Sequence, residues 1–133
     1  MSTILVIDDD GDVRDTVALV LEEAGHKIVS ASSGAAGAEL FKETRPDLVI
    51  TDMIMPGSDG IEAIRAIQDI DSAARIIATS GTSYAGSGYY LKLAKRFGAM
   101  AVLAKPFEAD ELLSVVSSCL SADTAEKAPD QAE

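Results

Sequence analysis

Asp52 lies where an apolar run of strand-forming residues, 48–51, gives way to the loop-forming sequence Met-Pro-Gly-Ser-Asp-Gly of residues 55–60. If the run is a strand buried on both faces, the Asp52 carboxylate lies at the strand's carboxyl end, where open α/β sheets bind their ligands. Taken alone, the same carboxylate could equally cap a helix or belong to the loop. Its interpretation therefore depends on which other side chains reach the same place.

Polar side chains follow three other apolar runs in the same way. Asp8 and Asp9 come directly after the first run, Thr79 and Ser80 end a later one, and Lys105 ends the last. Because parallel strands all point the same way, their carboxyl ends meet at one edge of the sheet. We therefore expect these side chains and Asp52 to lie close together.

The expected cluster holds three carboxylates and one ammonium. At an effective dielectric of about 20, two carboxylates ~4 Å apart repel by about 4 kcal/mol, so the cluster needs more positive charge than Lys105 supplies. Oxygen ligands without a nearby histidine or thiolate favour Mg²⁺ over Zn²⁺, and such a site could also hold a phosphoryl group. Each member also has a plain structural interpretation: Ser80 could be a turn residue and Lys105 a solvated one, and Asp10 is expected to cap a helix.

Five apolar, β-prone runs alternate with five helical patterns along the chain. The predicted strands are residues 3–7, 27–30, 48–51, 75–79 and 100–104. The predicted helices end at Gly25 for the first and cover about 33–43, 61–70, 89–97 and 108–120 for the others. Four of the five runs lack the alternation of a half-exposed strand, which predicts a parallel sheet covered on both faces, a three-layer α/β/α fold.

Length and composition indicate one domain, residues 1–121, followed by an acidic tail, 122–133, that we expect to be disordered. A formal charge of −11 argues against nucleic acid or an anionic membrane as the direct partner. No apolar run is long enough to span a membrane, and the first residues do not resemble a signal peptide, so a cytoplasmic location is expected. The single cysteine, Cys119, lies among apolar residues and is interpreted as a structural thiol.

Four motifs, in this order, resemble the response-regulator receiver domains of two-component signalling. They are Ile-Leu-Val-Ile-Asp-Asp-Asp (4–10), Asp-Met-Ile-Met-Pro-Gly-Ser-Asp-Gly (52–60), Thr-Ser-Gly (79–81) and Ala-Lys-Pro-Phe (104–107). The resemblance extends from about residue 3 to residue 120. It implies a flavodoxin-like sheet of strand order 2-1-3-4-5, on a stand-alone receiver domain without an output domain.

The resemblance also implies a role for each acidic residue. Asp52 would be the phosphoacceptor. Asp9, Asp52 and the backbone carbonyl of Ile54 would bind Mg²⁺, with Asp8 acting through a metal-bound water. The phosphoryl group would come from the phosphohistidine of a sensor histidine kinase or a histidine phosphotransfer protein, or from a small phosphodonor.

The other matched residues are implied to sense the phosphoryl group. Lys105 would contact it, the Ser80 hydroxyl would be drawn toward it, and the Lys105–Pro106 peptide would be cis. The loop 81–88 and the surface formed by the fourth helix, fifth strand and fifth helix would change in response and control binding of a downstream protein. The residues assigned to this switch or partner surface are Thr79, Gly81, Thr82, Tyr84, Tyr89, Tyr90, Val102 and Pro106.

The chain departs from the family pattern at two positions. Val102 stands where many receivers have a Tyr or Phe coupled to the hydroxyl, so the change is expected to rest on the loop and the fourth helix. Ile54 cannot hydrogen-bond an attacking water through its side chain, which predicts a long-lived aspartyl phosphate. Tyr84, Tyr89 and Tyr90 are either core and rim aromatics or partner contacts, and we favour a partner contact for at least one.

The resulting interpretation is a signalling switch, monomeric or dimeric upon phosphorylation, that catalyses only its own phosphorylation and dephosphorylation. A phosphorelay intermediate is the main alternative, and reverse transfer to a histidine phosphotransfer protein would identify it. A Mg²⁺-dependent phosphohydrolase would need a second acid or base and a cap, neither of which the sequence shows. A flavodoxin-like cofactor binder would purify with bound flavin.

Overall fold

The computed structural model describes residues 2–55, 58–81 and 87–122, with the side chains of 54–55, 58–60 and 87–91 excepted. Within these ranges the elements are β1 (Thr3–Ile7), α1 (Gly11–Glu23), β2 (Lys27–Ala31), α2 (Gly34–Thr44), β3 (Leu48–Asp52), β4 (Ile54–Met55), β5 (Ser58–Asp59), α3 (Gly60–Ile70), β6 (Ile76–Gly81), α4 (Ser87–Arg96), β7 (Ala101–Lys105) and α5 (Ala109–Ser121). Thr82, Tyr84 and the tail beyond Ala122 lie outside the described residues.

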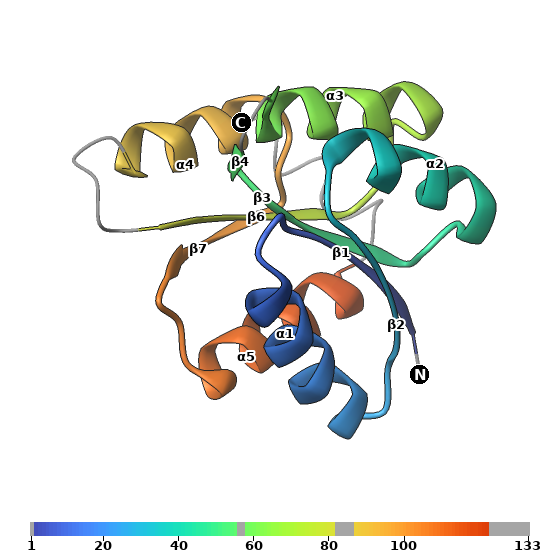
Figure 1. The fold of residues 1–133 in the computed structure, drawn as a ribbon, viewed down its shortest axis with the longest axis vertical. Coiled ribbons are helices and arrows are strands. Elements are labelled where there is room, and N and C mark those ends of the chain that lie inside the picture. Colours follow the sequence, from blue (N-terminus) through green and yellow to red (C-terminus); the bar gives the residue numbers. More distant parts are fainter. Residues whose placement is uncertain (1, 56–57, 82–86, 123–133) are drawn as a thin grey trace.

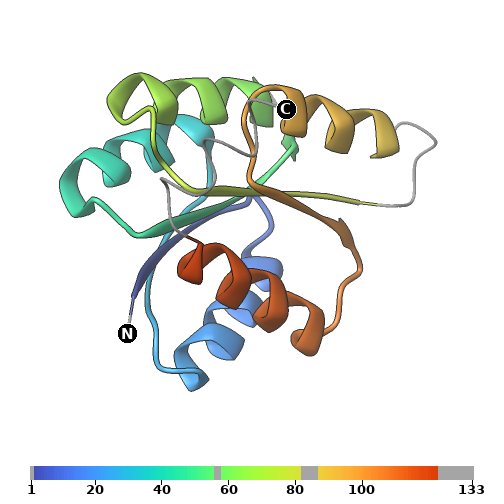
Figure 2. The same cartoon turned by 180° about the vertical axis from the view of Figure 1, so that it is seen from behind.

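Five strands form one parallel sheet in the order β2-β1-β3-β6-β7. β6 and β7 are the fourth and fifth long strands, so the predicted order 2-1-3-4-5 is confirmed. Helices α2, α3 and α4 cover one face, and α1 and α5 lie together on the other (Figure 1; Figure 2). The predicted three-layer α/β/α fold is therefore confirmed.

Alternate residues of the central strands pack against the two helical layers. In β1, Leu5 and Ile7 join the core beneath α2, α3 and α4, whereas Ile4 and Val6 join the core against α1 and α5. All four are at most 2% exposed, which explains why the run lacks a polar alternation. Cys119 of α5 is buried in the second core, as expected of a structural thiol.

The helix cap predicted at Asp10 forms, and Ser33 caps the next helix. Asp10 precedes α1 and its Oδ1 accepts hydrogen bonds from the backbone N–H groups of Asp12 (2.9 Å) and Val13 (3.4 Å). Ser33 caps α2 by accepting from the N–H of Ala36 at 3.1 Å. α1 ends before Gly25, whose φ of +100° is readily adopted only by glycine. These local signals start and stop the helices that lead away from β1 and β2.

Most boundaries agree with the prediction to within one residue, and three larger differences remain. β6 continues through Ser80 and Gly81, which were expected to begin a loop, because Ala104 and Lys105 of β7 supply ladder partners for them. α4 begins at Ser87 and not at Tyr89. The sequence predicts a loop over residues 55–60, but Met55 and residues 58–59 belong to the short antiparallel pair of β4 and β5.

No helix in the described ranges is long and apolar enough to cross a membrane.

Candidate functional site

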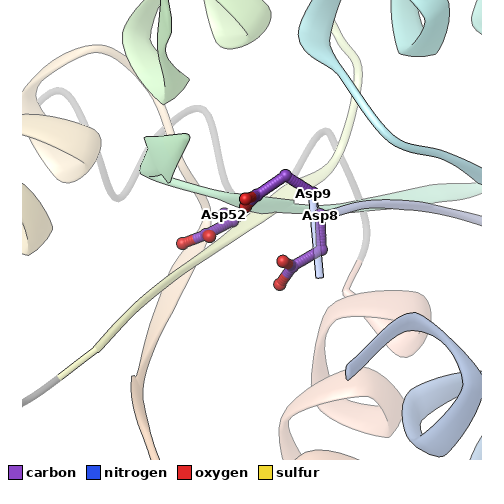
Figure 3. A group of neighbouring side chains, drawn as sticks. All are labelled: Asp8, Asp9 and Asp52. Carbon is purple, nitrogen blue, oxygen red and sulfur yellow. The ribbon is translucent and has the colours of Figure 1, made fainter. Parts of the chain in front are cut away.

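The parallel register of β1 and β3 brings three carboxylates together. Ile7 pairs with Thr51, so the next residues, Asp8 and Asp52, lie beside each other at the strand ends. One carboxylate oxygen from each of Asp8, Asp9 and Asp52 lies within 4.8 Å of the others. Figure 3 shows these side chains at the ends of β1 and β3, with their carboxyl groups directed to the same side. The acidic cluster predicted from the sequence therefore exists.

Asp8 is fixed by several backbone contacts. It is 2% exposed, and its Oδ1 accepts from the N–H of Asp10 at 3.0 Å. Its own N–H donates to the carbonyl of Ala31 at 3.1 Å, which extends the pairing of β1 with β2 by one hydrogen bond. Nη1 of Arg14 donates to the carbonyl of Asp8 at 2.7 Å. The loop that carries the acidic pair is therefore tied to both β2 and α1.

Lys105 bridges the two buried carboxylates. Its Nζ lies 2.8 Å from Oδ2 of Asp8 and 3.5 Å from Oδ2 of Asp52. Burial by itself lowers the pKa of Lys105, but the hydrogen bond to Asp8 and the charges of Asp52 and Asp8 outweigh it, so the pKa is raised. The side chain is therefore charged at neutral pH, and this electrostatic stabilisation is lost only as the pH rises through the raised pKa.

The cluster keeps an excess of negative charge even with Lys105 in place. Asp8 and Asp52 are at most 5% exposed, whereas Asp9 is exposed. Three carboxylates against one ammonium leave a formal excess of two negative charges, which a divalent cation would neutralise. The donors are all carboxylate oxygens, the ligand type that suits Mg²⁺, so the residues present fit the predicted metal.

Ser80 and Thr79 end β6 beside the acidic cluster. Thr79 pairs with Asp52, and its carbonyl accepts from the N–H of Met53 at 2.8 Å, which fixes the chain directly after Asp52. Ser80 is fully buried, and its Oγ has no hydrogen-bond partner in the described part of the chain. Leaving a buried hydroxyl unsatisfied costs about 1–3 kcal/mol. A hydrogen bond from this hydroxyl to a new acceptor at the acidic cluster would therefore be favourable.

The structure places some of the other predicted switch residues. Val102 of β7 is partly buried against the core beneath α2, α3 and α4. Gly81 pairs with Lys105 at the end of β6. The Lys105–Pro106 bond is cis, as the resemblance implied. The side chains of Ile54, Tyr89 and Tyr90 lie outside the described residues, although their backbones belong to β4 and α4.

The hydrogen bond from Arg14 to the carbonyl of Asp8 was not predicted from the sequence. Helical side chains point back toward the amino end of their helix. An arginine at the fourth position of α1, after an acidic strand end, can therefore reach the backbone of that strand. The position of Arg14 in the predicted first helix was therefore enough to predict this contact.

Comparisons with known proteins agree with this geometry. The profile of a family described as "Response regulator receiver domain" matches residues 4–117. The chemotaxis protein CheY of Bacillus subtilis is 37% identical over 119 residues, which cover 89% of this chain and 97% of CheY. Sporulation initiation phosphotransferase F of the same organism is 34% identical, with 88% of this chain and 92% of that protein covered.

A solved structure supports the same relationship. The response regulator receiver domain protein from Clostridium thermocellum is 32% identical and superposes with a TM-score of 0.83, over 90% of this chain and 94% of that one.

Proposed function

The chain belongs to the response regulator receiver domain family, and from that premise we propose that it is a signalling switch activated by phosphorylation of Asp52. The observation that carries the proposal is the position of Lys105, whose ammonium contacts both buried carboxylates of the acidic cluster. The site thus combines an oxygen nucleophile, further carboxylates and a fixed positive charge, which are the groups that phosphoryl transfer to a carboxylate requires.

The metal assignment is part of the proposal. Asp9, Asp52 and the backbone carbonyl of Ile54 would hold Mg²⁺, and Asp8 would contact it through a bound water. Mg²⁺ would supply positive charge for the oxygens of the incoming phosphoryl group. The three carboxylates within 4.8 Å of one another support this assignment.

The chemical step uses groups of this chain. A carboxylate oxygen of Asp52 attacks the phosphorus of a partner phosphohistidine or a small phosphodonor. The new O–P bond forms as the P–N bond of phosphohistidine breaks, and the electron pair stays on the imidazole nitrogen. Lys105, charged at neutral pH, neutralises the transferred oxygens. Water later hydrolyses the resulting acyl phosphate.

The response to phosphorylation is proposed to run through Ser80. The phosphoryl group brings acceptor oxygens to a buried hydroxyl that has no partner in the described residues. A hydrogen bond to them would pull the end of β6 inward and, through residues 82–86, shift α4. Val102 offers no ring whose rotamer could report this movement, so β6 and α4 would carry the signal.

Replacing Ser80 with Ala is expected to leave phosphorylation intact but remove the conformational response. The wild type should show changed hydrogen exchange in β6 and α4 after phosphorylation, and Ser80→Ala should show little change. Because the lost hydroxyl has no partner, the unphosphorylated variant should melt at or above the wild-type temperature. Ser80→Thr, which keeps a hydroxyl, is the matched control. Equal exchange changes in Ser80→Ala and the wild type would exclude this role.

Replacing Ile54 with Asn is expected to shorten the lifetime of the aspartyl phosphate. An amide two residues beyond Asp52 can hydrogen-bond an attacking water, and one such bond corresponds to about a two- to tenfold faster hydrolysis. The half-life is measured by intact-mass spectrometry after removal of the phosphodonor. Ile54→Val, which stays apolar, should keep the wild-type half-life. An unchanged half-life in Ile54→Asn would contradict the proposal that Ile54 slows hydrolysis.

A phosphorelay intermediate remains the second candidate because sporulation initiation phosphotransferase F is a 34% identical relative. Its partner would be a histidine phosphotransfer protein. Transfer of labelled phosphate from the phosphorylated chain to such a protein would favour the relay. Hydrolysis without transfer would favour a terminal switch.

A further inference from the structure

A basic surface lies on an otherwise acidic protein. Lys92, Lys95 and Arg96 of α4 are exposed, and α4 contains no acidic residue. The whole chain carries a formal charge of −11. We call these three residues, with the exposed Phe97 that follows them, the α4 patch. Helix formation alone does not require three basic residues and no acidic one on α4, so this positive charge needs another explanation.

The charges of the α4 patch have no partner in the described part of the chain. Lys92, Lys95 and Arg96 form no ion pair there. Phe97 is 38% exposed, and its ring lies 6.0 Å from the guanidinium carbon of Arg65 on α3. Lys95 and Arg96 also gain from the negative end of the helix dipole, but that interaction leaves their charged groups exposed and able to bind an acidic ligand.

A cavity of about 520 Å³ adjoins the α4 patch at the carboxyl ends of α3 and α4. Lys95 and Arg96 line it, and none of the described residues around it is acidic. The described residues that line it are Gln68, Ser72, Ala74, Lys95, Arg96, Gly98, Ala99 and Met100. Nε2 of Gln68 donates to the carbonyl of Phe97 at 2.7 Å and thereby fixes the turn after α4. The cavity is therefore a defined, positively charged recess.

The end of α5 lies close to this recess. Arg75, the neighbour of the cavity residue Ala74, donates to the carbonyls of Leu120 (3.0 Å) and Ala122 (2.7 Å). α5 lies on the opposite face of the sheet from α3 and α4, but its end and the recess lie at the same edge of the sheet, where β6 and β7 begin. The eleven residues that follow, 123–133, include four carboxylate side chains and one lysine. They can reach at most about 40 Å when extended, so the recess is within their range.

We propose that residues 123–133 bind across the α4 patch and its recess. The tail carries the charge that complements the patch, and its attachment beside Arg75 gives it a high effective concentration there. An acidic segment of another protein that binds α4 must then displace the tail. The contact is electrostatic and exposed to solvent, so salt should weaken it.

The test uses a nitroxide label on the full chain. Ala128→Cys carries the label, and Cys119→Ala removes the native thiol. The label should broaden the amide signals of residues 92–98 and of Gln68 more than those of β2. The double variant Lys95→Gln/Arg96→Gln, or 0.5 M salt (a Debye length of roughly 4 Å), should remove most of this broadening. Lys27→Gln/Lys42→Gln, which removes the same charge elsewhere on the surface, should leave it intact.

Three outcomes would overturn the proposal. The first is that the label causes no broadening of the patch signals, or that the broadening is equal in the Lys95/Arg96 and Lys27/Lys42 variants. The second is broadening in a sample that mixes labelled unenriched chain with unlabelled ¹⁵N-enriched chain, which would make the occupant the tail of a second copy. The third is that the signals of the patch move only when a glutamate-rich peptide is added, which would make the partner another acidic chain and not the tail.

Discussion

Asp52→Asn is expected to abolish phosphorylation of this protein. Incubation of the wild type with Mg²⁺ and a small phosphodonor should give one phosphate adduct in intact-mass spectrometry, and the variant should give none. The amide has no anionic oxygen to attack phosphorus. It keeps the size of the side chain and its place beside Thr79, so a folding defect is not expected. The expected loss is complete because the proposal assigns the nucleophile to Asp52 and gives Asp8 and Asp9 the role of holding Mg²⁺.

The matched control is Asp69→Asn, which removes an equal charge from an exposed position on α3. It should be phosphorylated like the wild type. An adduct of equal yield on Asp52→Asn would show that another residue accepts the phosphoryl group, and the proposed function would then lose its nucleophile. This outcome would leave the tail proposal untouched, because the α4 patch and the recess do not involve Asp52.

Mg²⁺ is expected to raise the melting temperature, and Asp52→Asn is expected to stabilise the metal-free protein. Asp52 is repelled by the carboxylates of Asp8 and Asp9 and attracted by the ammonium of Lys105, so removing its charge relieves two repulsions for one ion pair lost, a net gain on the order of 2 kcal/mol. Mg²⁺ at ten times its dissociation constant adds about 1.4 kcal/mol. For a domain of this size each kcal/mol corresponds to about 3–5 °C, so both shifts are measurable by thermal denaturation.

Two further variants distinguish the contribution of Asp9 to Mg²⁺ binding from that of Lys105 to the stability of the metal-free protein. Asp9→Asn, at an exposed position, should lose most of the Mg²⁺ response. Lys105→Met should destabilise the metal-free protein by about 3–5 kcal/mol, because it leaves Asp8 buried without its cation, and Mg²⁺ should restore part of the loss. If Mg²⁺ shifts nothing and Asp52→Asn destabilises, the proposed balance of charges is wrong.

The predictions that succeeded rest on local or repetitive signals. Asp10 and Ser33 mark helix starts because their side chains satisfy backbone groups two or three residues away. The apolar runs predicted a sheet covered on both faces, since four of the five strands have no polar face to turn toward water. The acidic cluster followed from that topology, because parallel strands place Asp8 and Asp52 at one edge whatever the length of chain between them.

The errors arose where a partner distant in the sequence decides the structure. Ser80 and Gly81 read as loop residues, yet β7 pairs with both of them and keeps them in the sheet. β4 and β5 form only by pairing with each other, and strands of two residues are too short to show an alternation of apolar and polar residues in the sequence. The contact between Arg14 and the backbone of Asp8 is different, because these residues are close in the sequence and the direction of helical side chains could have predicted it.

The sequence by itself therefore determined the layers, the strand order through its resemblance to a family, and the kinds of side chain at the sheet edge. Only the tertiary structure decided that Lys105 binds Asp8 more closely than Asp52, that the Ser80 hydroxyl is buried without a partner in the described residues, and that the chain leaves α5 beside a basic recess. These features depend on distances between atoms from different strands and helices. Such distances are set by packing and strand register, which residue types in sequence do not encode locally.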